Sequence, residues 1–186
     1  MTKGRNTETL VYTIRDKCRV CYTCVRECPV KAIKIINGQA EVIEERCIAC
    51  GNCTRVCSQG AKAFLNTTSR VNRLLESDQK VFAILAPSFI SEFSEIKDFR
   101  KVIGMTRKLG FDKIFEVAFG ADLVAREYRK MVFKKDLRGF ISSDCPAIVA
   151  YIEKYHPEIV SSLAPVVSPM VAMSRYLKYK YGEDFK

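Results

Sequence analysis

The chain lacks any long hydrophobic run. Its uninterrupted apolar stretches, such as the seven residues 81–87, do not exceed eight residues, whereas a helix needs about 20 to span a bilayer. A membrane-spanning helix is therefore excluded at the level of the sequence. The N-terminal stretch from Met1 to Lys17 is polar and charged, so we expect no secretory signal peptide and, by default, a cytoplasmic and anaerobic setting.

Histidine and dense runs of one charge are also scarce. The single histidine, His156, follows a helical pattern and precedes Pro157, and we expect it on the surface rather than in a metal site. Lysine and arginine outnumber aspartate and glutamate by 31 to 21, but they are spread along the chain, which argues against a nucleic-acid partner. With 186 residues, 48% hydrophobic and 28% charged, the chain has a globular composition and room for one medium domain or two small ones.

Cysteine, in contrast, is unusually frequent, with nine residues in the chain. Eight of them form two runs with the spacing C-x2-C-x2-C-x3-C, and the offset from each member of the first run to its counterpart in the second is constant. Such a fixed displacement is an internal repeat. Pro29 follows the first run, whereas Ser58 takes that place after the second, so no proline restricts the turn there. The runs are Cys18, Cys21, Cys24 and Cys28, and Cys47, Cys50, Cys53 and Cys57.

Three kinds of chemistry compete for these thiols. Disulfides need an oxidising compartment, for which no export signal is present. Zinc is usually held by two cysteine pairs set well apart in the sequence. Here three thiols are crowded within seven residues, twice, which suits a cubane iron–sulfur cluster whose fourth thiolate comes from elsewhere. The spacing therefore favours iron–sulfur clusters over zinc or disulfides.

The cysteine pattern resembles the bacterial ferredoxins that carry two 4Fe-4S clusters, over about residues 8–68. In that pattern the fourth cysteine of each run serves the other cluster. The resemblance implies two crossed groups of ligands, which we call the first and second ligand sets. The first ligand set is Cys18, Cys21, Cys24 and Cys57, and the second is Cys47, Cys50, Cys53 and Cys28.

Local patterns agree with a small α+β module. Residues 10–15 alternate as a strand does, and residues 33–43 read as a hairpin that turns at Asn37-Gly38. Short helices are expected after the third cysteine of each run. About 60 residues bury too little apolar surface to be secure alone, so we expect metal ligation to supply stability and the metal-free form to be largely unfolded.

The basic balance of this module also suits bound clusters. Residues 1–68 carry 11 basic and 6 acidic side chains, whereas four thiolates around a core of charge about 2+ leave a net charge of about −2. Nearby cations partly offset that charge and favour the reduced form of a cluster.

Residues 69–186 differ from the cysteine-rich part of the chain, because strands are expected to alternate with helices there. Strands are expected at residues 81–86, 113–118 and 139–142, and helices at residues 96–109 and from Gly120, Pro146 and Pro169. This alternation predicts an α/β arrangement with a mainly parallel sheet. The fold class expected is an α+β ferredoxin-like module with two cubane clusters, followed by a partial α/β domain. The expected boundaries are residues 1–68, a linker helix within residues 69–79, and residues 80–186.

Cys145 stands apart from the two runs. It lies after the third expected strand and before Pro146, a residue typical of the first helical position. A helix N-terminus lowers the pKa of a thiol and makes it a better ligand, whereas the neighbouring Asp144 carboxylate opposes ionisation. A buried free cysteine without a role is the alternative.

Five stretches, taken in order, resemble the large subunit of the iron-only hydrogenases. They are residues 83–88 (AILAPS), 108–113 (KLGFDK), 119–123 (FGADL), 142–146 (SSDCP) and 153–158 (EKYHPE). In that family a T-S-C-C-P motif supplies an H-cluster ligand, which corresponds to Cys145, and a proton-transfer cysteine, which is Asp144 here. That exchange resembles the regulatory or sensory branches of the family.

The other H-cluster motifs of the family are absent from these 186 residues, so one of four H-cluster cysteines is present. We therefore assign no catalytic residue, regard Cys145 as a possible remnant H-cluster ligand, and expect no complete H-cluster and no hydrogen turnover on this chain alone.

Three functions follow from these expectations. The first is an electron-transfer protein that passes single electrons through two 4Fe-4S clusters. The second is a piece of a hydrogenase-related enzyme or of a hydrogen- or redox-sensing regulator. The third is a non-catalytic iron–sulfur scaffold that docks a redox partner through an unpaired sheet edge. The expected partner is a redox protein or a segment beyond Lys186, with no small-molecule substrate.

Overall fold

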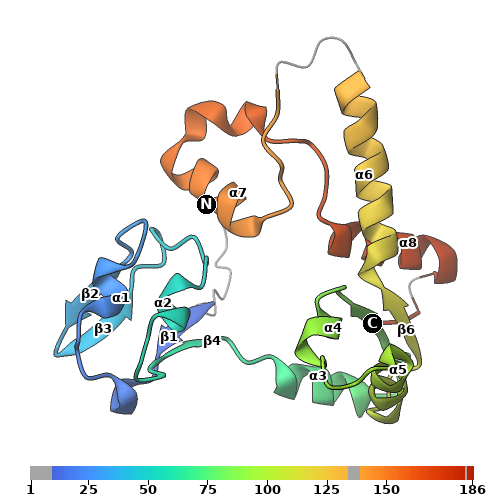
Figure 1. Cartoon of the computed structure of the whole chain (residues 1–186), viewed down its shortest axis with the longest axis horizontal. Helices are drawn as coiled ribbons and strands as arrows, with labels where there is room; N and C mark the ends of the chain where they lie inside the picture. Colours follow the sequence, from blue (N-terminus) through green and yellow to red (C-terminus); the bar gives the residue numbers. More distant parts are fainter. Residues whose placement is uncertain (1–9, 134–138, 183) are drawn as a thin grey trace. The chain divides into compact units, whose positions relative to one another are not determined.

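The structure is a computed structural model that describes residues 10–133, 139–182 and 184–186 (Figure 1). Its contacts divide the chain into two units. The first comprises residues 1–66 and 146–160, and the second comprises residues 67–145 and 161–186. An α+β fold results, in which short sheets are combined with helices. The boundaries expected from the sequence, residues 1–68 and 80–186, stay a prediction.

Two antiparallel strand pairs form the frame of the first unit. β1 pairs with β4, and β2 pairs with β3 (Figure 1). The β2–β3 hairpin turns at Asn37 and Gly38, whose φ angles of 48° and 70° are both positive. Asn-Gly is the preferred pair for such a turn, and the predicted hairpin is confirmed. The strands are β1 (Val11–Thr13), β2 (Ile33–Ile36), β3 (Gln39–Val42) and β4 (Lys62–Phe64).

Each cysteine run continues into one short helix. α1 (Thr23–Arg26) contains Cys24, and α2 (Asn52–Arg55) contains Cys53. The prediction that these helices follow the two cysteines is wrong, because each helix begins just before its cysteine. The residue before each helix has a left-handed conformation, which reverses the chain early enough for the helix to include the thiol. A short 3-10 helix, η1 (Arg15–Lys17), precedes the first run.

Helix α7 (Pro146–Tyr155) belongs to the first unit although it lies far along the sequence. It begins at Pro146, as predicted. Lys154 Nζ donates to the carbonyl oxygen of Cys47 at 2.6 Å, and Tyr155 Oη donates to that of Arg46 at 2.8 Å. Tyr155 also packs against the buried core of the unit. Contacts that no local pattern reveals therefore attach this helix to the second cysteine run.

Helices and one parallel strand pair build the second unit. β5 runs parallel to β6, from Phe82 opposite Lys113 to Leu85 opposite Glu116. Lys80 adds an isolated parallel bridge to Phe185. The elements are α3 (Thr68–Leu75), β5 (Phe82–Leu85), α4 (Phe89–Glu92), α5 (Phe99–Lys108), β6 (Lys113–Glu116), α6 (Val117–Phe133), η2 (Pro157–Ser162, which spans the boundary between the units) and α8 (Pro169–Tyr181).

Two of the strands expected in this unit need correction. The third strand, at residues 139–142, is wrong: Ile141 forms only an isolated parallel bridge to Leu163, and the left-handed Gly139 (φ 49°) interrupts extended backbone just before it. The second strand stops at Glu116, because Val117 already begins α6. Helix α4 had no counterpart among the predictions.

The packing of α6 on α8 depends on Gly120. A Cβ atom at this position would overlap the carbonyl oxygen of Pro169 and lie 3.0 Å from Met173 Cβ. Gly120 is therefore required for close approach of two helices rather than as a helix start. Ser168 caps α8 by accepting a hydrogen bond from the N–H of Val171.

Among the helices of the described residues, none is both long and apolar enough to cross a membrane.

Candidate metal centres

The backbone of the two cysteine runs repeats together with their spacing. Three left-handed positions recur at the offset of the cysteine repeat, and four of the six residues there are not glycine. An L-residue in this conformation costs about 1–2 kcal/mol, so the loops need stabilisation from elsewhere. The pairs are Val20 and Ala49 (φ 53° and 54°), Tyr22 and Gly51 (61° and 76°), and Lys31 and Gly60 (50° and 57°).

The turn after each run also repeats. The N–H of Lys31 donates to the carbonyl oxygen of Cys28, and the N–H of Gly60 donates to that of Cys57. Ser58, which stands where the first run has a proline, therefore leaves the turn unchanged.

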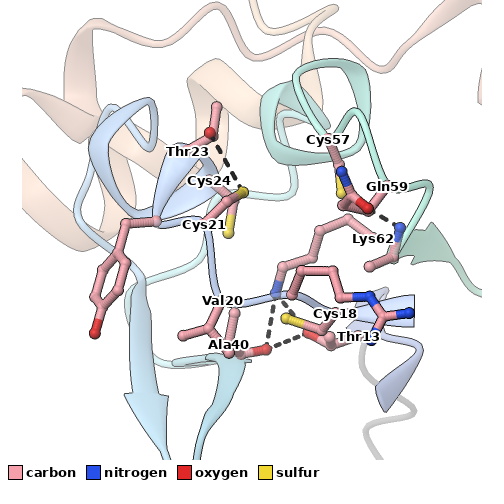
Figure 2. A pocket seen from close by; sticks show the side chains of 13 residues that line it. Thr13, Cys18, Val20, Cys21, Thr23, Cys24, Ala40, Cys57, Gln59 and Lys62 are labelled. Carbon is pink, nitrogen blue, oxygen red and sulfur yellow. Dashed lines mark hydrogen bonds between the residues drawn. The ribbon is translucent and has the colours of Figure 1, made fainter. Parts of the chain in front are cut away.

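The first cavity is lined by the first cysteine run and by residues of β1, α1, β3 and the start of β4. Figure 2 shows its four labelled cysteines around a common space, with Cys57 on the side opposite Cys21 and Cys24. Three of the thiols come from the first run and the fourth comes from the end of the second. The four are Cys18, Cys21, Cys24 and Cys57.

The second cavity is lined by the four cysteines that the first cavity does not contain. Three belong to the second run and one to the end of the first. The two cavities thus group the cysteines as the two predicted ligand sets do, whereas the ligation itself stays a prediction. The four thiols here are Cys28, Cys47, Cys50 and Cys53.

Backbone N–H groups point at three of these sulfur atoms. Two of the bonds are repeat equivalents, because Ala61 and Cys57 occupy in the second repeat the places of Ala32 and Cys28 in the first. Donors directed at sulfur stabilise negative charge there and tune an iron–sulfur cluster. Four thiols in each cavity, with such a donor to one of them in the first cavity and to two in the second, therefore fit a 4Fe-4S cluster. The bonds join Ala32 N to Cys28 Sγ (3.2 Å), Ala61 N to Cys57 Sγ (3.3 Å) and Ala49 N to Cys47 Sγ (3.4 Å).

The environment of the thiols divides them by how readily they ionise. Burial raises the pKa of Cys24 and of Cys53, because a thiolate is poorly solvated there. The Thr23 hydroxyl and backbone N–H lower the pKa of the exposed Cys21. At Cys57, burial opposes ionisation, but backbone N–H donors outweigh it and lower the pKa. Those donors belong to Ala61, Lys62 and Gln59.

Each cavity exposes one of its sulfur-bearing residues to solvent. Cys21 in the first cavity and Cys50 in the second are exposed, whereas Cys24 and Cys28 are buried. The two exposed residues are repeat equivalents. Each cavity therefore has one cysteine at the molecular surface.

Lys62 is a residue of the first cavity that the sequence did not single out. It is 6% exposed, and its Nζ donates to Thr13 Oγ1 at 2.6 Å and to the carbonyl oxygen of Ala40 at 3.2 Å. Thr13 Oγ1 itself donates to the same carbonyl. The repeat offered a signal: the equivalent position in the first repeat is Ile33, which has no charge.

Cys145 lies in the second unit and is exposed. Asp144 beside it accepts a 2.8 Å hydrogen bond from Ser142 Oγ, and Tyr128 Oη of α6 lies 3.2 Å from the same hydroxyl. Ser143 Oγ donates to the carbonyl oxygen of Val166 at 2.7 Å. These hydrogen bonds hold the loop beside Cys145 in place. In the described ranges, no three His, Cys, Asp or Glu side chains are arranged to hold a single metal ion.

Two known families match this chain. Residues 79–186 match the family described as iron only hydrogenase large subunit, C-terminal domain. Residues 10–58 match the 4Fe-4S dicluster domain.

One curated protein and two solved structures are among those similar to this chain. Iron hydrogenase 1 of Clostridium pasteurianum is 33% identical over 181 residues, which cover 83% of this chain and 32% of that protein. A solved FeFe-hydrogenase, studied for inactivation of its H cluster by oxygen, has a TM-score of 0.51 at 21% identity and covers 63% of this chain and 35% of its own. Another, studied for H-cluster assembly, has a TM-score of 0.49 at 23% identity, with the same coverage. The chain therefore spans about a third of the length of these relatives.

Proposed function

The chain belongs to the iron-only hydrogenase large-subunit family, with a 4Fe-4S dicluster domain ahead of the C-terminal-type domain, and from that premise we propose that it carries single electrons through two 4Fe-4S clusters. The first ligand set, in the first cavity, holds one cluster, and the second ligand set, in the second cavity, holds the other. The two halves are related by a ferredoxin-like pseudo-twofold arrangement.

One observation carries this proposal. Each cavity is lined by three cysteines of one run and the last cysteine of the other. Neither zinc sites nor disulfides explain why four thiols surround each of two separate cavities. Two 4Fe-4S clusters explain it if each takes three ligands from one run and the fourth from the other. The repeat of backbone conformation between the two cysteine runs supports the pseudo-twofold relation.

The residues around each site influence electron transfer in two ways. They stabilise negative charge on the cluster, and they control how closely a partner can approach it. When bound, each 4Fe-4S cluster supplies one-electron redox chemistry. The N–H donors of Ala32 and Ala61 stabilise additional negative charge on the sulfur atoms of Cys28 and Cys57. The apolar side chains of the core exclude water between the runs, and the exposed edge at Cys21 or Cys50 leaves a short path to a partner.

Anaerobic reconstitution of the full chain with iron and sulfide tests the proposal. About eight iron and eight sulfide per chain are expected, because each of two clusters contains four of each. Reduction by dithionite should give the electron paramagnetic resonance of reduced 4Fe-4S clusters. A folded chain that holds zinc instead, or about four iron, would contradict the proposal.

A second function is favoured by the match of residues 79–186 to the hydrogenase domain. On this view the chain is part of a hydrogenase-related enzyme or of a hydrogen-sensing regulator, with Cys145 as one H-cluster ligand. The remaining ligands would come from residues outside this sequence. Hydrogen gas should then reduce the reconstituted protein, with an iron content clearly above eight per chain. Absence of both effects contradicts this second function and leaves the electron-transfer proposal intact.

A further inference from the structure

The two cavities correspond position by position but differ in chemistry. Every residue that lines the first cavity, apart from Val20, has its repeat equivalent in the lining of the second. At four of these positions the first cavity has a polar or charged residue and the second has an apolar one. The pairs, with the first cavity given first, are Thr13 and Val42, Arg19 and Ile48, Gln59 and Val30, and Lys62 and Ile33.

Lys62 and Ile33 form the most informative of these pairs. Both are 6% exposed, so the two repeats bury equivalent side chains to the same extent. One brings an ammonium group to its cavity, and the other brings only methyl and methylene groups. The difference is therefore a difference of charge at nearly constant burial. Arg19, by contrast, is exposed, so water and salt screen its charge.

The hydrogen-bond partners of the Lys62 ammonium group are neutral. Its Nζ donates to a hydroxyl and a carbonyl, those of Thr13 and Ala40, and no carboxylate within the described part of the chain forms an ion pair with it. A buried ammonium is costly unless a negative charge lies close. The thiolates of the first ligand set, with the net negative cluster that they would hold, are the anionic group that this cavity can offer.

We propose that Lys62 makes the first site the one that takes up the electron first, because it holds a fixed positive charge against that cavity which the second cavity lacks. The inference rests on the proposed function and adds a direction to it. A reduced cluster carries one more negative charge than an oxidised one, so a nearby buried cation favours the reduced form. An electron that reaches either exposed edge therefore comes to rest at the site lined by Cys18, Cys21, Cys24 and Cys57.

Lys62 also acts on the second site, but less directly. Its charge favours ionisation of Cys24 in the first cavity and of Cys53 in the second. Lys62 lines only the first cavity, however. Its loss should therefore shift the potentials of both sites in the same direction, with the larger shift at the first.

The test compares single-site proteins. Cys50→Ala removes an exposed ligand of the second site, and Cys21→Ala removes its repeat equivalent at the first. Lys62→Met is then introduced into each background, and redox titrations are followed by electron paramagnetic resonance. We expect a more negative midpoint potential in the Cys50→Ala background and a smaller shift in the Cys21→Ala background. Lys62→Arg, which keeps the charge, should restore the original potential.

The control is Lys34→Met, which removes an equal charge from an exposed position on β2. We expect it to leave both potentials near their original values, and at high salt concentration the effect of Lys62→Met should persist because a buried charge is poorly screened. Equal shifts in the two backgrounds, no shift in either, or an equal shift from Lys34→Met would overturn the inference.

Lys62 also supports the backbone, so a folding defect needs a separate measurement. If Lys62→Met takes up no iron at the first site, Lys62→Gln replaces it, because the amide retains donors for Thr13 and Ala40 without the charge. A wild-type potential in Lys62→Gln then overturns the inference. Failure of the unmodified chain to take up iron overturns the proposed function instead, so the two failures are distinguishable.

Discussion

The two units of this chain differ in what fills their interiors. The first has strands of three or four residues and helices of four within residues 10–66, with cysteines inside its core. The second packs a long helix, α6 (Val117–Phe133), on α8 (Pro169–Tyr181) and surrounds β5 with aromatic rings, as Phe82 with Phe115 and Tyr181. The difference leads us to expect that the first unit needs bound clusters for its stability, whereas the second unit is stabilised by side-chain packing.

Removal of iron should give the largest contrast between the units. After a chelator has removed the iron under anaerobic conditions, residues 10–66 should lose their protection from hydrogen exchange. The strained loops and short elements there no longer have a metal to hold them. Helix α7 should lose protection with them, since Lys154 and Tyr155 donate hydrogen bonds to the second cysteine run and the residue before it. The amides of α6 and α8 should stay protected. Equal protection with and without iron in both units would contradict the comparison.

The crossed ligand sets give the next largest effect. Cys28→Ala should lower the iron content from about eight to about four per chain and expose Cys47, Cys50 and Cys53 to alkylation, while the thiols of the first set stay protected. Cys57→Ala, its repeat equivalent, should do the reverse. Mass spectrometry of alkylated peptides measures both outcomes. Selective loss of the cluster next to Cys28 in the sequence would show that the ligation is not crossed.

A packing change should affect the second unit alone. Gly120→Ala places a Cβ atom against the Pro169 carbonyl and Met173, and overpacking of this kind costs about 1–3 kcal/mol of stability. Hydrogen exchange of α6 and α8 measures the loss. The control is Gly104→Ala in α5, where a Cβ atom meets nothing within 4 Å and where alanine should stabilise the helix by about 0.5–1 kcal/mol. An equal loss in both variants would contradict the close approach.

A single hydroxyl should report how firmly α7 is attached to the first unit. Tyr155→Phe removes the donor to the carbonyl of Arg46, and a hydrogen bond of this kind contributes about 0.5–1.5 kcal/mol. We expect faster hydrogen exchange in α7 and faster loss of iron to a chelator. Tyr179→Phe, at a side chain that is 90% exposed, should change neither rate.

Cys145→Ala should have the smallest effect. The thiol is exposed and lies in the second unit, so iron content and the spectra of the 4Fe-4S clusters should be unchanged. Loss of about four iron per chain would mean that Cys145 ligates a cluster, and the electron-transfer interpretation of the chain would have to be revised in favour of the hydrogenase-related one.

Local signals predicted the elements that depend on one or two residues. Asn37-Gly38 specified the hairpin turn, and prolines specified the first residues of α7 and α8. The strand expected at residues 139–142 failed because four residues with an apolar pattern do not determine their own partner. Ile141 forms a single bridge with Leu163 instead of pairing with β6. That partner depends on how the surrounding chain folds.

The sequence by itself was enough to predict which eight thiols form two groups of four, because few cysteine spacings suit an iron–sulfur cluster. It also determined where turns and helix starts occur, since glycine, proline and capping side chains act on their own backbone. Only the tertiary structure decided that α7 joins the cysteine module and that a lysine is buried beside one cavity while isoleucine occupies the equivalent place beside the other. Burial and charge proximity arise between segments distant in sequence, so no local pattern contains them.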